Sequence, residues 1–478
     1  MSEINAGISS AGSDAIGSDD DLLGRTLDRI PFSVYHLLLV VILGLVGFVE
    51  GYDTAITGAL LVLARGPLHL TAEDTPWLVV VPTMAVVASV FVGSLLNDRF
   101  SRKNLMQAGI IITTLFTLLI PLAHTADQLI ALRILGSIGV GFAIPAAYPI
   151  GAELLPAQHR RTFATIYELV LATAFVLLPF FGFLLARNPD GFRLIALPGG
   201  LALFVVPVLV HFIVPQSPRW QLSKGRATAA AASVNWIIAR AGNAIAPLDS
   251  AALTSGGARA SAKLPPYAAL FRPGQLRFTI VGILCGVSST VAYYIFAFLL
   301  PRALVAQGAA VSLSFGLSSL LFLATLPGKV LVGFLMEAIG RRWTILFALL
   351  GAVPGLLLMA IAHLTGDLAA IVFSIGALIT GMTVLSSFPA TRMYLSEQFP
   401  TSLRGRGHFL GETVARLLGG VVAPFLLTPY IGSPVIFFGS VLVVVAIGAL
   451  PPLLYGKETV GQLEVVARTG VPAAATSS

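Results

Sequence analysis

Two carboxylates, Glu50 and Asp53, interrupt an apolar stretch of the sequence, GFVEGYDTAITGALL at residues 47–61. Charge is costly at membrane depth, so an ionisable residue in such a stretch is a functional candidate. The spacing of three residues places both carboxylates on one face of a helix. A carboxyl group in such surroundings can be neutral in one state and charged in another when a cation approaches. The pair therefore predicts proton coupling, with a static buried salt bridge as the alternative.

Four basic residues also lie inside apolar runs: Arg133, Lys329, Arg392 and Arg416. A guanidinium group presents a planar fork that binds a carboxylate bidentately, so Arg392 and Arg416 are candidates to bind an anionic substrate. Glu412 precedes Arg416 by four residues, and the two can simply pair with each other on a helix. Arg392 can instead extend to the membrane surface.

The composition of the chain identifies the elements that must position these groups. Of its 478 residues, 56% are hydrophobic and 11% are charged, and the mean hydropathy is +0.90. Soluble globular proteins carry about 25% charged residues, so an integral membrane protein is indicated. The backbone in lipid must be helical unless strands close into a barrel. The apolar runs are continuous rather than alternating, which disfavours a barrel.

Twelve apolar runs have the length of about 20 residues that spans a bilayer. The expected fold class is therefore an all-α membrane protein with twelve transmembrane helices in two six-helix bundles. The runs cover residues 37–63, 77–97, 104–123, 129–151, 163–186, 194–214, 278–300, 313–336, 344–363, 368–391, 408–428 and 434–455.

The runs divide the chain into five segments. They are an N-terminal tail (1–36), a first six-helix bundle (37–215), a loop (216–275), a second six-helix bundle (276–457) and a C-terminal tail (458–478). The tails and the loop are expected in the cytoplasm. The loop contains QLSKGRATAAAASVNWIIARAG, which predicts a short amphipathic helix at the membrane surface.

The distribution of Lys and Arg sets the expected orientation. With the N-terminus in the cytoplasm, the outer loops hold four of the 29 basic residues, four lie inside spans and the remaining 21 lie in cytoplasmic segments. This bias follows the positive-inside rule, so both termini are expected in the cytoplasm and the protein in the inner (plasma) membrane. The net charge of +7 therefore reflects topology, and nucleic acid is not an expected partner.

Two motifs occur once in each half of the chain. The spacing E-x-x-P-x-x-x-R is found in AELLPAQHR and again in SEQFPTSLR, each after the fourth span of its half. NDRFSRK (97–103) and MEAIGRR (336–342) each follow the second span of their half. Parallel six-span repeats are typical of one transporter architecture.

With these repeats the chain resembles the major facilitator superfamily over nearly its whole length. The family's loop motif between spans two and three reads G-x-L-x-D-R-x-G-R-R/K. Here it is SLLNDRFSRK, with serine at two positions where the family has glycine, and the second-half copy has Glu337 in place of the aspartate. The resemblance implies a cytoplasmic gate in which Asp98 caps a helix N-terminus and bonds an arginine of the neighbouring bundle. The residues expected in this gate are Asp98, Arg99, Arg102, Glu153, Arg160, Glu337, Arg341, Glu397 and Arg404.

Further pieces resemble sugar porters and their organic-ion relatives: GYDTAITG in the first span, PQSPRW at 215–220 and KET at 457–459. Asp53 matches the first-span aspartate of proton-coupled sugar porters, which the resemblance implies works with an arginine of span four. Arg133 in LRILGSIGVGF matches that arginine. The expected proton-coupling residues are thus Asp53 and Arg133, with Glu50 as a further candidate. The glycines of GSIGVG indicate close helix packing rather than nucleotide binding.

The residues with which sugar porters bind hydroxyl groups are absent. The positions of the family's glutamines, asparagine and tryptophan hold Glu168, Ile283, Leu284, Ser289 and Thr391. Without those partners each buried sugar hydroxyl would be left unpaired, at about 1–3 kcal/mol each. A sugar is therefore disfavoured as the substrate.

The first-span pattern F-x-E-G-Y-D looks more like that of the aromatic-acid:proton symporters, whose substrates are aromatic carboxylates. We therefore expect a secondary active carrier that imports a small organic anion, an aromatic carboxylate, with protons by alternating access. The expected substrate-binding residues are Glu168, Tyr52, Tyr293, Tyr294, Arg392, Arg416 and Glu412. The expected partners are the anion, protons and the lipid bilayer. We expect a monomer with no cofactor and no enzymatic activity.

Two alternatives stay open. Glu50, Asp53 and Glu168 can instead attract a cation, which would make the protein a proton-coupled exporter of a drug or an organic cation. The other alternative, from a different class, is a membrane sensor that binds a ligand without translocating it.

Overall fold

The computed structural model describes residues 19–71, 73–96, 99–253, 266–399 and 401–455, and these residues form helices with no strand among them. Twelve helical spans within them are long and apolar enough to cross a membrane, which confirms the expected all-α membrane fold. The spans coincide with the twelve apolar runs. The first span begins at Val34, ahead of the expected residue 37, because Ser33 caps it and His36 Nδ1 lies 3.2 Å from the Ser33 amide.

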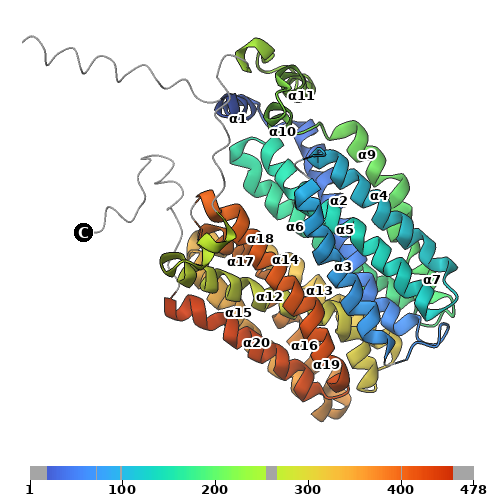
Figure 1. Cartoon of the computed structure of the whole chain (residues 1–478). Coiled ribbons are helices and arrows are strands. Elements are labelled where there is room, and N and C mark those ends of the chain that lie inside the picture. The colour runs from blue at the N-terminus through green and yellow to red at the C-terminus, as the bar shows by residue number, and fades with distance from the viewer. Residues whose placement is uncertain (1–18, 72, 97–98, 254–265, 400, 456–478) are drawn as a thin grey trace, which may run out of the picture.

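The first bundle occupies mainly the upper right of Figure 1, in blue to green. Its helices are α2 (Val34–Leu63), α3 (Asp74–Leu96), α4 (Arg102–Leu119), α5 (Ala126–Leu154), α6 (Arg160–Leu185), α7 (Gly191–Leu194), α8 (Leu197–Leu201) and α9 (Val206–Ile213). The last three together form the sixth span.

The second bundle occupies mainly the lower left of Figure 1, in yellow to red. Its helices are α12 (Pro273–Ala306), α13 (Val311–Leu323), α14 (Thr325–Ala338), α15 (Arg341–Ile361), α16 (Ala369–Met382), α17 (Phe388–Glu397), α18 (Thr401–Leu417), α19 (Ala423–Leu427) and α20 (Pro434–Tyr455). The pairs α13–α14, α16–α17 and α18–α19 each form one span.

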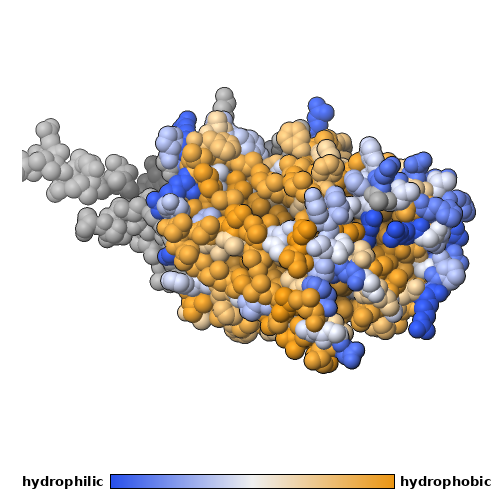
Figure 2. Space-filling view, turned by 90° about the horizontal axis from the view of Figure 1, so that it is seen from below, coloured by the Kyte–Doolittle hydropathy of each residue, from blue (hydrophilic) through white to orange (hydrophobic). Residues whose placement is uncertain are grey.

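The outer surface of the bundles is largely apolar. Figure 2 shows hydrophobic residues over much of one face, with hydrophilic residues gathered mainly toward its ends. Large apolar side chains lie exposed on both bundles, among them Phe204, Phe212, Phe334, Phe425 and Leu454. A belt of this kind suits the hydrocarbon of a bilayer, where apolar surface needs no water.

Three short helices mark one end of the bundles, which we name the terminal end; the opposite end is the far end. They are α1 (Asp19–Arg29), α10 (Pro218–Ser223) and α11 (Ala227–Arg240). The loop sequence expected to form one amphipathic helix forms two, because Gly225 adopts a positive φ of 69° between them. Leu27 of α1 and Ile237 of α11 belong to one buried apolar cluster with Leu39 of α2, so these helices pack on the first bundle.

Three spans of the second bundle are not continuous helices, although their apolar runs are unbroken in the sequence. A break at Ala324 separates α13 from α14, and a π-helical segment, η9 (Leu418–Val422), separates α18 from α19. Between α16 and α17, Thr383 has φ −104° and ψ −96°. There Ser386 donates its hydroxyl hydrogen bond to the carbonyl of Gly381, at 2.7 Å. Such side-chain bonds satisfy backbone groups that an interrupted helix leaves free in a membrane.

The two bundles are in close contact in their far halves. An added Cβ at Gly58 of α2 would overlap the Ala297 carbonyl oxygen of α12, so the two backbones nearly touch. Arg302 of α12 donates a hydrogen bond to Thr75 of α3, and Ser319 of α13 donates one to the Val176 carbonyl of α6 at 3.1 Å. The far end is therefore closed in this structure.

The glycines of GSIGVG pack helices closely, as expected. A Cβ at Gly139 of α5 would lie 2.5 Å from the carbonyl oxygen of Gly109 in α4, and a Cβ at Gly109 would lie 2.5 Å from that of Gly139. Only glycine allows this mutual approach, which lets backbones pack without side chains between them.

We expect Gly139→Val to destabilise the protein by about 1–3 kcal/mol, because the added side chain must push α4 and α5 apart. Gly333→Val is the matched control, since nothing lies within 4 Å of a Cβ added there. Thermal melting of the two purified variants in detergent measures the difference. Equal melting temperatures for the two variants would contradict the close packing of α4 on α5.

Candidate functional site

Ionised side chains from both bundles meet at mid-depth. They line one cavity between the bundles. Its acidic residues are Glu50 of α2, Glu168 of α6 and Glu412 of α18, and its basic residues are Lys329 of α14, Arg392 of α17 and Arg416 of α18. Three carboxylates thus face three cations, and the set is neutral when all are ionised.

Three ion pairs in this cavity join the two bundles. Arg392 lies 2.5 Å from Glu168, and Lys329 lies 2.9 Å from the other oxygen of the same carboxylate. Arg416 lies 3.3 Å from Glu50. In each pair the acid belongs to the first bundle and the base to the second.

Glu412 holds both arginines from within the second bundle. It lies 2.9 Å from Arg392 and 3.9 Å from Arg416, and Arg416 also donates a hydrogen bond to the Tyr294 hydroxyl at 3.2 Å. The i, i+4 pairing of Glu412 with Arg416 is therefore present, but it does not occupy the arginine fully. Arg392 does not extend to the membrane surface, because Glu168 and Glu412 hold it in the cavity.

Asp53 and Arg133 form the tightest pair in the first bundle. Arg133 contacts one Asp53 carboxylate oxygen at 2.5 Å and the other at 3.2 Å, and it also donates to the Asp53 carbonyl and to Thr57. Both side chains are almost fully buried, at 4% and 2% exposure. A second cavity, lined by Asp53, Arg133, Tyr294 and Arg416 among others, lies between this pair and the central arginine. The expected contact is present; its role in proton coupling stays a prediction.

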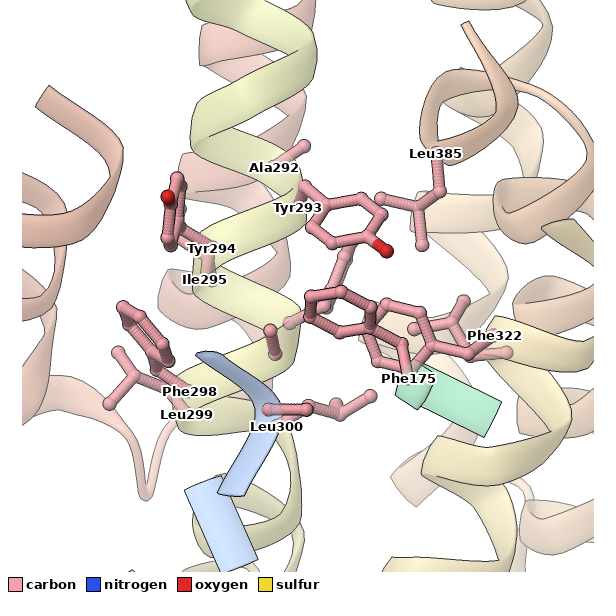
Figure 3. Packing of buried hydrophobic residues seen from close by; sticks show 14 of the residues in the cluster. Phe175, Ala292, Tyr293, Tyr294, Ile295, Phe298, Leu299, Leu300, Phe322 and Leu385 are labelled. Atoms are coloured by element: carbon pink, nitrogen blue, oxygen red, sulfur yellow. The ribbon is translucent and has the colours of Figure 1, made fainter. Parts of the chain in front are cut away.

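Aromatic rings form the wall of the central cavity toward the bundle interface. Tyr293 of α12 packs edge-on against Phe175 of α6 at 4.6 Å and against Phe388 of α17 at 4.9 Å between ring centroids. Phe322 of α13 lies 5.5 Å from Tyr293 and 5.4 Å from Phe175. Figure 3 shows Tyr293, Phe175 and Phe322 gathered beside α12. Rings from both bundles thus build one apolar surface beside the charges.

Tyr293 and Tyr294 line the cavity as expected, but Tyr52 does not. The Tyr52 ring lies against Gly199 inside the first bundle, and its hydroxyl donates to the Ile195 carbonyl at 2.6 Å. The expectation for Tyr52 is therefore wrong in this structure. The physical reason is that residues two apart on a helix point in different directions, so Tyr52 cannot share the direction of Glu50.

The duplicated motifs form matching ion pairs at the terminal end. Glu153 pairs with Arg102 at 3.0 Å in the first bundle, and Glu397 pairs with Arg341 at 3.6 Å in the second. In each half the glutamate of the E-x-x-P motif thus binds an arginine of the loop motif. Both of these pairs lie within one bundle, and the expected cytoplasmic gate between the bundles stays a prediction.

The other expected gate residues have separate surroundings. Arg160 lies 3.3 Å from Asp28 of α1, and Arg99 and Glu337 are exposed. Asp98 and the side chain of Arg404 lie outside the described residues. The proposed bond between Asp98 and the second bundle therefore stays a prediction.

Sequence reasoning did not assign seven of the lining residues to the site: Gly51, Thr54, Leu171, Phe175, Thr290, Lys329 and Phe388. Lys329 was recognisable, since it is one of the four basic residues inside apolar runs. The two phenylalanines had no recognisable signal, because the chain contains 29 of them. Among the described residues, no group of three His, Cys, Asp or Glu side chains is placed to hold a metal ion.

Comparison with known proteins agrees with this architecture. The family model for the Major Facilitator Superfamily matches residues 43–424. The structure of the xylose transporter XylE from E. coli in an inward open conformation is similar with a TM-score of 0.67, at 17% identity, covering 91% of this chain and 99% of that one. This likeness concerns the fold.

Curated transporters are similar in sequence. The niacin transporter NiaP of Acinetobacter baylyi is 26% identical over 450 residues, which covers 92% of this chain and 98% of the relative. The 4-hydroxybenzoate transporter PcaK of the same organism is 29% identical over 214 residues, 42% of this chain and 44% of the relative. The human organic cation/carnitine transporter 2 is 25% identical over 396 residues, 79% of this chain and 67% of the relative.

We expect Asp53→Asn and Arg133→Gln, made singly, each to destabilise the protein by about 3–5 kcal/mol, because each leaves a buried charge without its partner. The double variant, which leaves no charge, is expected to be more stable than either single variant. SDS titration in mixed micelles measures the free energies of unfolding. The exposed pair Asp190 and Arg193, 3.4 Å apart, is the control, with expected effects below about 1 kcal/mol. If the double variant lost as much unfolding free energy as the two single variants together, Asp53 and Arg133 would not stabilise each other.

Proposed function

The chain belongs to the major facilitator superfamily, and from that premise we propose that it imports a small aromatic carboxylate together with a proton by alternating access. The observation that carries the proposal is the central cavity, in which two arginines are held by carboxylates of both bundles beside an aromatic wall. The niacin and 4-hydroxybenzoate transporters among the relatives support this substrate class.

Arg416 is the proposed anchor for the substrate carboxylate. Its contacts with Glu50 and Glu412, at 3.3 and 3.9 Å, are longer than those of Arg392 with Glu168 and Glu412, at 2.5 and 2.9 Å. A guanidinium binds a carboxylate best through two parallel hydrogen bonds, and such bonds are shorter than those Arg416 makes here. A substrate carboxylate can therefore improve on Glu50 as the partner of Arg416.

If the substrate carboxylate displaces Glu50 from Arg416, this displacement explains why a proton is carried with the substrate. The cavity is neutral before the substrate enters, so a bound anion would leave one negative charge in excess. A buried carboxylate without a cationic partner takes up a proton rather than stay charged. Glu50 would become that neutral acid, still within 3.5 Å of the Tyr167 hydroxyl. One proton would then accompany each monocarboxylate.

Asp53 and Arg133 are proposed to take part in the same coupling. The cavity between them and Arg416 places a second carboxylate within the polar interior of the first bundle. Because Arg133 holds Asp53 through several contacts, we assign the proton that responds to substrate to Glu50. Glu50 would exchange this proton with Asp53.

The places where the bundles touch support the proposal of alternating access. The positive-inside bias supports a cytoplasmic terminal end and an inner-membrane location. A structure closed at its far end would then face inward. Cross-bundle ion pairs at mid-depth hold the bundles together. Substrate on Arg416 and a proton on Glu50 would remove one of these ties, which lets the loaded carrier change state. We expect a monomer to be sufficient.

Cation export is the second candidate, and the similarity to the organic cation/carnitine transporter favours it. Against it, Glu50, Glu168 and Glu412 each already pair with a basic residue in the cavity. A cation would have to displace a guanidinium or ammonium group that cannot leave the bundle.

We expect Glu50→Gln to abolish accumulation of radiolabelled benzoate in proteoliposomes under an acid-outside pH gradient, while benzoate counterflow without a gradient persists. The reason is that glutamine mimics the protonated acid permanently and cannot release a proton. Arg416→Gln should lose both activities at least about tenfold, since an anion loses its charged partner. Rates in protein-free vesicles are subtracted, because benzoic acid crosses lipid unaided.

Asp190→Asn, an exposed change far from the cavity, is the matched control and should behave as wild type. Full gradient-driven accumulation by Glu50→Gln would contradict its role as the proton site. Counterflow of tetraethylammonium in place of benzoate would support cation export. Movement of neither compound would favour the sensor.

A further inference from the structure

One polar atom in the wall of the central cavity has no partner. The hydroxyl of Tyr293 is buried and makes no hydrogen bond with any described residue, and the whole residue is 5% exposed. Other buried tyrosines differ: Tyr294 accepts from Arg416, and Tyr35 donates to the Ile213 carbonyl at 2.9 Å. Buried tyrosine hydroxyls usually find a partner, because leaving one unpaired costs free energy.

The side chains around this hydroxyl hold the Tyr293 ring in place but offer the hydroxyl no hydrogen-bond partner. Edge contacts with Phe175, Phe322 and Phe388 fix the ring between the two bundles. Figure 3 shows the Tyr293 oxygen at the end of a ring that projects among Phe175, Phe322 and Leu385, all apolar. A rotation of the ring would therefore meet aromatic neighbours rather than a polar group. Tyr293 also lines the central cavity, so a molecule bound there is the candidate partner for the hydroxyl.

One ring of the cavity wall contacts both Tyr293 and a cavity arginine. The guanidinium carbon of Arg392 lies 5.2 Å from the centroid of the Phe388 ring, and the Tyr293 ring lies 4.9 Å from the same centroid. Phe388 thus contacts both Arg392 and Tyr293, so the cationic side of the cavity and Tyr293 lie against the same aromatic ring. A substrate with its carboxylate on the arginines would bring the remote edge of its own ring toward the Tyr293 hydroxyl.

We infer that Tyr293 hydrogen-bonds a polar atom on the substrate ring, remote from the carboxylate, and thereby selects ring-hydroxylated or ring-nitrogen aromatic acids over unsubstituted ones. A phenolic hydroxyl can bond in either direction, so it serves a ring hydroxyl group or a ring nitrogen equally. The inference rests on the proposed function, since the arginine-bound carboxylate sets the direction of the ring. Tyr293 is in this account a specificity-determining residue and takes no part in proton movement.

The test is competition with radiolabelled benzoate counterflow by benzoate, 3-hydroxybenzoate, 4-hydroxybenzoate and nicotinate in proteoliposomes. Wild type should prefer at least one of the three ring-polar acids to benzoate by roughly tenfold, as expected for one buried hydrogen bond. Tyr293→Phe should lose this preference and keep the affinity for benzoate. Tyr35→Phe removes a hydroxyl that bonds elsewhere and should keep the wild-type order.

Two results would overturn the inference while the proposed function stands. One is a wild type that binds benzoate as tightly as all three ring-polar acids, a comparison that needs no variant to fold. The other is a Tyr293→Phe protein, folded by its melting temperature, that weakens all four acids equally. Failure of wild type to bind any of the four acids would overturn the proposed function and the inference with it.

Discussion

The arrangement of buried charge at mid-depth is the constraint on which the rest of the structure depends. The first bundle contributes Glu50 and Glu168 to the cavity, and the second contributes Glu412 with three cations, so neither bundle is neutral there by itself. Ions taken out of water are costly unless they are paired and hydrogen-bonded. The bundles must therefore meet at this depth, and whatever enters the cavity must respect its charge balance.

Other features of the molecule support that arrangement. The interrupted spans of the second bundle carry all its cavity cations: Lys329 on α14, Arg392 on α17 and Arg416 on α18. Interrupted helices at a membrane midplane are where transporters place their binding sites. Pairs that lie within one bundle, such as Asp53 with Arg133 in the first and Glu397 with Arg341 in the second, hold the helices of each bundle together.

Much of this could be predicted from residues whose types are rare in apolar surroundings. The twelve spans followed from hydrophobic runs, and Glu50, Asp53, Arg133, Arg392 and Arg416 were recognisable because charge at membrane depth is exceptional. The ion pairs between the bundles could not be predicted, because Glu168 and Arg392 are 224 residues apart and only the docking of the bundles sets their distance. The break at Thr383 was not predicted either; there Ser386 bonds the Gly381 carbonyl, a contact that only the folded chain shows. Tyr293 and Tyr52 could not be distinguished in the sequence, because only the fold shows which helix face turns toward the cavity.

The central claim is that the cavity stays neutral when an anion enters because one proton enters with it. The most direct test is the initial rate of benzoate uptake into proteoliposomes, corrected for protein-free vesicles, under two separate driving forces. With the membrane potential clamped at zero by potassium and valinomycin, an acid-outside pH gradient should accelerate uptake. With equal pH on both sides, a potential of either sign should leave the rate unchanged. Acceleration by an inside-positive potential would mean that the anion crosses alone, and acceleration by an inside-negative potential would mean that more than one cation accompanies it; either would contradict the account.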